Sequence, residues 1–84
     1  MSYRISFHPS AQKELSKIPK EIYERVKKKV LALAENPRPE NARKLVGSKE
    51  WRIRVGTWRV IYLIDDDARE VFITVIGHRR EVYR

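Results

Sequence analysis

The sequence contains no cysteine. It can therefore form neither disulfide bonds nor thiolate metal sites, which fits a reducing, cytoplasmic setting. No apolar run approaches the ~18–20 residues of a membrane span, and the first ten residues lack the apolar segment of a secretory signal. We therefore expect a cytoplasmic protein without a membrane partner, with residues 1–84 forming a single domain.

The sequence is also poor in acidic residues: 11 of them face 19 lysines and arginines, which gives a net charge of +8. A positive field of this size indicates a polyanionic partner, such as nucleic acid, an acidic membrane surface or an acidic protein. The alternative is the charged surface of a thermophilic protein. Such surfaces usually gain glutamate together with lysine, so the imbalance favours the polyanion.

Several catalytic patterns are missing too. No cluster of Asp, Glu or His has metal-ligand spacing, no glycine-rich loop could cradle a phosphate, and no serine has an evident base. The acidic run 65–67 lacks the spacing of an EF-hand and predicts a plain turn. We expect neither a metal nor a cofactor. Any RNA cleavage would have to use the substrate's own 2′-OH, with protein groups positioning it and moving protons.

The first half of the chain predicts one strand and a helical hairpin. Residues 2–7 alternate apolar and polar side chains, which is typical of a strand with one buried face. Residues 10–18 and 20–36 carry apolar stripes at helical spacing, with Pro19 between them. His8, at the end of the strand, is interpreted as structural.

A run of three lysines, residues 27–29, lies in the second predicted helix. One interpretation is a patch that binds nucleic acid. The interpretation we prefer is a solvated helix face, partly paired with Glu24 three and four residues earlier. In either case the run adds to the long-range attraction of a polyanion.

The second half of the chain predicts strands joined by short turns. Apolar alternation or two-sided apolar runs mark strands over residues 51–55, 58–64 and 70–76, with a short edge strand over 42–46. Gly56-Thr57 signals a tight hairpin. The order predicts an α+β domain: a small, twisted, mainly antiparallel sheet with the helical hairpin on one face and the other face partly open.

Three arginines gather at this predicted hairpin. Arg52 and Arg54 point the same way along one strand, and Arg59 lies just across the turn. Packing gives no reason to cluster like charges, whereas a phosphate does, because guanidinium groups grip phosphate oxygens with paired hydrogen bonds. We predict a phosphate site here. The alternative is three separate, solvated arginines.

The closing stretch, residues 77–84, supplies the remaining candidates. His78 can exchange a proton near neutral pH, and Tyr83 offers a ring on which a base can stack. Candidates for the general base are His78, Tyr83 and Glu81. Further cations expected at the RNA are Lys44, Arg79, Arg80 and Arg84.

Two segments carry a family resemblance, WRIRVGTWRVIY at 51–62 and IGHRREVYR at 76–84. With them, over nearly its whole length, the chain resembles the RelE branch of the RelE/ParE superfamily of toxin–antitoxin toxins. The resemblance implies a fold similar to a microbial ribonuclease. It also implies a toxin that cuts mRNA in the ribosomal A site, without metal, by 2′-OH attack, and a cognate antitoxin that neutralises it.

The resemblance implies a role for each matching residue. Arg52 and Arg54 match paired basic positions at which some members carry lysines, one of them proposed as the general base. Arg59 matches an arginine that contacts the scissile phosphate, and Arg79 matches one that stabilises the transition state. Tyr83 matches a tyrosine that stacks on the mRNA base or helps to transfer a proton. His78 stands where other members have a basic residue, as a proton donor.

Two other functions remain open from the sequence. A ParE-like toxin would poison DNA gyrase without nuclease activity, and Arg59, Arg79 and Tyr83 argue against it. An RNA-binding module with the same fold would have no activity. Translation arrest with cut mRNA distinguishes the first expectation from both.

Overall fold

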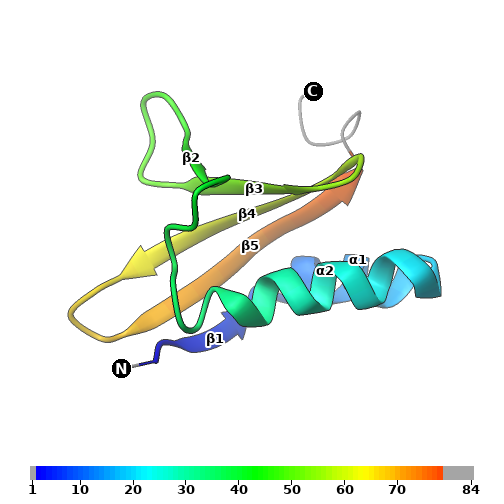
Figure 1. Cartoon of the computed structure of the whole chain (residues 1–84), viewed down its shortest axis with the longest axis horizontal. Coiled ribbons are helices and arrows are strands. Elements are labelled where there is room, and N and C mark those ends of the chain that lie inside the picture. Colours follow the sequence, from blue (N-terminus) through cyan, green and yellow to red (C-terminus); the bar gives the residue numbers. More distant parts are fainter. Residues whose placement is uncertain (1, 79–84) are drawn as a thin grey trace.

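Figure 1 shows the computed structural model, which describes residues 2–78, with two helices lying along one face of a sheet. The strands are β1 (Arg4–Phe7), β2 (Arg43–Lys44), β3 (Trp51–Val55), β4 (Trp58–Asp65) and β5 (Glu70–His78). The helices are α1 (Pro9–Lys17) and α2 (Lys20–Ala32). The predicted α+β class, with a helical hairpin on one face, is confirmed.

The strands are ordered β1-β5-β4-β3-β2 across the sheet. β5 pairs with β4 in antiparallel fashion and with β1 in parallel, so the last of the described strands lies inside the sheet. β3 is antiparallel to both β4 and β2. The sheet is therefore mixed but mainly antiparallel, as expected.

The first helix begins where the sequence suggests. Pro9 occupies the first turn, and the Nδ1 atom of His8 accepts a hydrogen bond of 3.1 Å from the backbone N–H of Ser10. His8 is thus the N-cap of α1, which confirms its structural interpretation. Within residues 2–78 neither helix is long and apolar enough to cross a membrane.

The second helix is shorter than the predicted range of 20–36. It ends at Ala32, and residues 33–35 form a tightened turn in which Leu33, Ala34 and Glu35 donate to carbonyls three residues back. This geometry shifts the chain off the helix axis before Pro37. The expected edge strand over 42–46 is also shorter, because the chain reverses at 45–48 and leaves Val46 fully exposed.

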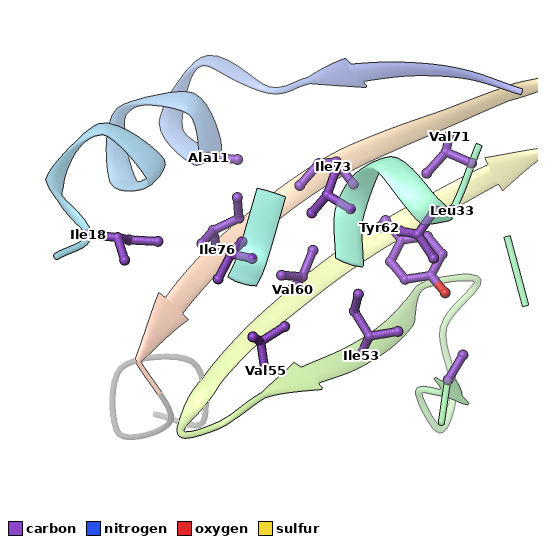
Figure 2. Close-up of a cluster of buried hydrophobic side chains, with 13 residues drawn as sticks. Ala11, Ile18, Leu33, Ile53, Val55, Val60, Tyr62, Val71, Ile73 and Ile76 are labelled. Carbon is purple, nitrogen blue, oxygen red and sulfur yellow. The ribbon is translucent and has the colours of Figure 1, made fainter. Parts of the chain in front are cut away.

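The core fills the space between the helices and the sheet (Figure 2). Apolar residues of the helices meet the inward-facing residues of β3, β4 and β5. The side chains with the least exposure there are Ala11, Val26, Val30, Leu33, Ile53, Val60, Tyr62, Val71, Ile73 and Ile76. The sheet face that packs on the helices is called the inner face below, and the opposite face is called the outer face.

β5 contains a β-bulge. Tyr62 of β4 pairs with Ile73, whereas the preceding Ile61 pairs with Val75, so Thr74 is an extra residue in β5. The Oγ1 atom of Thr74 donates a hydrogen bond of 3.1 Å to the carbonyl of Ile61. Because side chains alternate along a strand, the extra residue reverses which face each later side chain of β5 occupies.

Tyr62 links the core to the loop after α2. Its hydroxyl donates a buried hydrogen bond of 2.7 Å to the carbonyl of Pro37. Tyr62→Phe is expected to lower the free energy of unfolding by about 1–2 kcal/mol in urea, because the carbonyl loses its donor. Tyr23→Phe is the matched control and should be near neutral. Equal losses in the two variants would contradict this role for Tyr62.

Tyr62 also makes the free energy of unfolding depend on pH in the alkaline range. Burial raises the pKa of Tyr62 to about 12, whereas an unfolded tyrosine ionises near pH ~10. The stability that comes from the neutral phenol is therefore complete below pH ~10 and is lost as the pH rises towards 12. Tyr62→Phe should show less of this decline.

Candidate nucleic-acid interface

The outer face carries a block of arginines from three adjacent strands. Arg43 of β2 lies directly opposite Arg52 of β3, and Arg54 of β3 lies directly opposite Arg59 of β4. Side chains of directly paired residues point to the same face, with Cβ atoms about 5 Å apart. The structure thus brings together the three predicted arginines and adds Arg43, which the sequence analysis did not single out.

These arginines differ in their exposure to solvent. Arg54 is exposed, Arg52 is half-buried, and Arg59 exposes only 4% of its surface. A buried guanidinium is screened less by water, so its interaction with a nearby phosphate is stronger than that of an exposed one. Arg59 is therefore the arginine from which we expect the largest electrostatic effect on a bound phosphate.

Gly77 completes the cross-strand row that holds Arg54 and Arg59. In β5 it lies directly opposite Arg59. Because glycine has no side chain, β5 places no side-chain atoms beside Arg59 on the outer face. In the next row Arg52 lies opposite Ile61, and Ile61 lies opposite Val75.

The structure does not bring His78 together with these arginines, with which the sequence analysis had grouped it in one site. His78 pairs with Trp58, and the two rings meet edge-on with centroids 5.6 Å apart. Trp58 belongs to the inner-face row of β4, so His78 points to the inner side of the sheet. The bulge at Thr74 is the cause, since plain alternation along β5 would have placed His78 on the outer face.

Lys44 is also separated from the arginines. It pairs with Trp51, on the opposite face from Arg43 and Arg52. Its Nζ atom donates a hydrogen bond of 2.6 Å to the carbonyl of Ser48, which closes the turn before β3. Lys44 therefore makes a local structural hydrogen bond, and its contact with RNA stays a prediction.

The remaining predicted site residues lie outside the described residues. They are Arg79, Arg80, Glu81, Tyr83 and Arg84. Their roles stay predictions from the sequence.

Glu50 lies directly before β3, two positions before Arg52. Its Oε1 accepts a hydrogen bond of 3.1 Å from the hydroxyl of Ser48, and its Oε2 lies 3.5 Å from the Oγ1 of Thr74. Glu50 therefore joins the candidates for a proton acceptor, which sequence reasoning had sought only in the closing stretch.

A second polar cluster lies at the other end of the sheet. Asp66 accepts hydrogen bonds from both terminal nitrogens of Arg38, at 3.2 and 2.9 Å, and one of 2.7 Å from the hydroxyl of Tyr3. These bonds, chiefly those from Arg38, hold the pKa of the Asp66 carboxyl below its usual value. The hydrogen-bonded group of Tyr3, Arg38 and Asp66 is called the clasp below. It joins three distant segments and is present at neutral pH. It weakens only as the pH falls through that lowered pKa.

The outer face beside this clasp has a different chemistry from the arginine end. A shallow pocket of about 410 Å³ is lined there by Ser6, Leu63, Ile64, Asp65, Glu70 and Phe72. Two acids and several apolar side chains do not suit a phosphate. Within residues 2–78, no three His, Asp or Glu side chains are grouped closely enough to hold a metal ion.

Comparison with known proteins defines the class first. A family model described as the ParE toxin of a type II toxin–antitoxin system, parDE, matches residues 5–83. The chain is 34% identical to a protein named mRNA interferase toxin RelE from Escherichia coli K12, over 99% of this chain and 92% of that protein. It is 33% identical to Toxin RelG from Mycobacterium tuberculosis, over 100% and 99% of the two chains.

Solved structures agree with the sequence relatives. The isolated E. coli RelE toxin has a TM-score of 0.82 at 32% identity, over 98% of this chain and 92% of that chain. The RelE–RelB complex from Pyrococcus horikoshii gives 0.84 at 29% identity, over 94% and 97%. The chain therefore belongs to the RelE branch of the RelE/ParE superfamily of type II toxin–antitoxin toxins.

Proposed function

We propose that this chain is the toxin of a type II toxin–antitoxin system and acts in the cytoplasm as an mRNA interferase. It enters the ribosomal A site and cuts the mRNA there without a metal ion. The observation that carries the proposal is the arginine row on the outer face, in which Arg54 and the buried Arg59 lie side by side. Identity to a protein named mRNA interferase toxin RelE supports the same reaction.

The arginines act on the phosphate at which the chain is cut. Arg52 and Arg54 orient the mRNA backbone, and Arg59 binds the non-bridging oxygens of the scissile phosphate. Arg59 exposes only 4% of its surface, so water screens its charge little. Arg79, beyond the end of β5, stabilises the charge that develops on the phosphorane.

The reaction needs two proton transfers. A base takes the proton of the 2′-OH, the 2′-oxygen bonds to phosphorus, and the bond from phosphorus to the 5′-oxygen breaks. The departing 5′-oxygen takes up a proton, which leaves a 2′,3′-cyclic phosphate and a 5′-hydroxyl. Glu50, Glu81 and Tyr83 are the candidates for these transfers. His78 is left out because its ring lies on the other side of the sheet.

A cognate antitoxin is the second partner. Two of the structural relatives are described as toxin–antitoxin complexes, the RelBE2 complex of M. tuberculosis and the RelBE complex of E. coli. We propose that an acidic, partly disordered segment of the antitoxin of this chain covers the basic face and folds as it binds.

The proposal is tested with the purified chain, translating ribosomes and a primer-extension readout. We expect cleavage within the codon in the A site, new ends with a 2′,3′-cyclic phosphate, and no cleavage when the antitoxin is present. An mRNA with deoxyribose at the cut position should stay intact. Intact wild-type mRNA in this assay would overturn the nuclease assignment.

Induction in cells separates the remaining alternative. A translation toxin should stop protein synthesis and leave cut transcripts. DNA damage signalling with intact transcripts would instead identify a ParE-like gyrase poison.

A further inference from the structure

We infer that the pocket between α2 and β3 is a second phosphate-binding site, which holds the RNA backbone next to the cut. This inference deepens the proposed function and rests on it. The pocket has a volume of about 380 Å³. It is lined by Arg25, Lys28, Lys29, Ala32, Arg54, Val55 and Gly56.

The lysine run of α2 is divided by this pocket. Arg25, Lys28 and Lys29 stand three and four positions apart, so they share one face of the helix, beside β3. Lys27 belongs to the same run but does not line the pocket. The run was expected to form one solvated face. In the structure Lys28 and Lys29 line the pocket, whereas Lys27 does not.

The four cations of the pocket meet no acidic side chain in the part of the chain described. No acid lines the pocket, and the salt bridges found within residues 2–78 involve none of these cations. The expected pairing of Lys27 and Lys28 with Glu24 is likewise not among those salt bridges. The three like charges that α2 contributes to the pocket repel each other, and a bound anion would relieve this repulsion.

The hairpin turn keeps one wall of the pocket open. Gly56 has a φ of +61°, which a residue with a side chain rarely adopts. A Cβ atom at position 56 would lie 3.8 Å from both terminal nitrogens of Arg25. The guanidinium of Arg25 therefore lies against the bare backbone of the turn, and no side chain at position 56 separates a ligand from it.

Arg54 connects the pocket to the proposed RNA site. It lines the pocket and is also directly paired with Arg59 in the row proposed to bind the scissile phosphate. The pocket therefore adjoins the proposed cleavage site, an arrangement that suits successive phosphates of one strand. Its exposed cations suit the sequence-independent grip that single-stranded RNA receives from a basic groove.

The test is RNA binding by a triple variant with a charge-matched control. Arg25→Gln, Lys28→Gln and Lys29→Gln remove the α2 cations of the pocket. Lys13→Gln, Lys20→Gln and Lys27→Gln remove three exposed cations elsewhere on the helices. Both triples lose the same net charge, so a difference between them isolates the pocket from long-range attraction. The probe is a short single-stranded RNA with deoxyribose at the cut position.

The pocket triple should bind this RNA at least about 10-fold more weakly than the control triple, and its salt slope should be smaller by about 0.7 for each phosphate that the pocket no longer neutralises. In the ribosome assay it should need more programmed ribosomes for half-maximal cleavage, while the rate at saturation stays near that of the wild type. Arg59 variants should instead lose rate at saturation.

Equal RNA affinity and equal salt slope in the two triples would overturn the inference. Normal RNA binding combined with weakened binding of the antitoxin would also overturn it, because the pocket would then serve an acidic protein segment. If the wild type binds RNA but never cuts mRNA, the nuclease proposal fails alone, since the binding comparison does not depend on cleavage.

Discussion

Arg59→Ala is expected to reduce mRNA cleavage on the ribosome by about 100-fold or more, which is the usual cost of losing one preorganised group that stabilises transition-state charge. Arg59 exposes 4% of its surface and lies opposite Arg54 and Gly77. A guanidinium in this position is screened little by water, and a truncated side chain leaves nothing to replace it. Single-turnover primer extension on programmed ribosomes measures the effect.

Because Arg59 is buried, its variants need a control for folding. Arg59→Lys keeps the charge and most of the volume but cannot form the paired hydrogen bonds, so we expect a smaller loss of rate. Thermal unfolding of both variants shows whether the fold has survived. Arg79→Ala, tested in the same way, is expected to give a loss of similar size. Undiminished growth arrest by both alanine variants would contradict the proposed mechanism.

Ile73→Ala is expected to have the largest effect on stability, a loss of about 2–5 kcal/mol. Ile73 is fully buried in β5, where it pairs with Phe7 of β1 and Tyr62 of β4. Shortening it leaves a cavity between both neighbouring strands and the helices. A domain of this size is stable by only about 4–13 kcal/mol, so much of the margin would be lost. Urea unfolding gives the free energy directly.

Val46→Ala is the matched control for this loss. Val46 is fully exposed in the turn after β2, and its truncation should change the free energy of unfolding by less than about 0.5 kcal/mol. A similar loss in both variants would mean that the sheet interior contributes no more than its surface.

Local patterns in the sequence were sufficient for most of the architecture. The helices, the hairpin at Gly56 and the three long strands follow from apolar spacing and from turn residues, which depend on near neighbours in the chain. The arginine row was predictable for the same reason, since alternation along β3 and a tight turn bring Arg54 beside Arg59.

What the sequence could not supply depends on pairing between distant strands. At the bulge, β5 has one residue more than the segment of β4 with which it pairs. No local pattern in the sequence predicts this extra residue. The inner-side position of His78 follows from this bulge and could not be predicted from the sequence. The basic pocket depends on the packing of α2 beside β3. The sequence alone therefore does not show which lysines of the run line it.

The position of β5 also bears on the order in which the chain is made. Among the strands of residues 2–78, β5 is the last to leave the ribosome, yet it pairs with β1, from the first residues of the sequence, and with β4. Until it emerges, β1 has no partner strand and the inner face of the sheet lacks Val71, Ile73 and Ile76. A growing chain of this protein therefore cannot complete its sheet early. The sheet can be completed only after residues 70–78 have emerged.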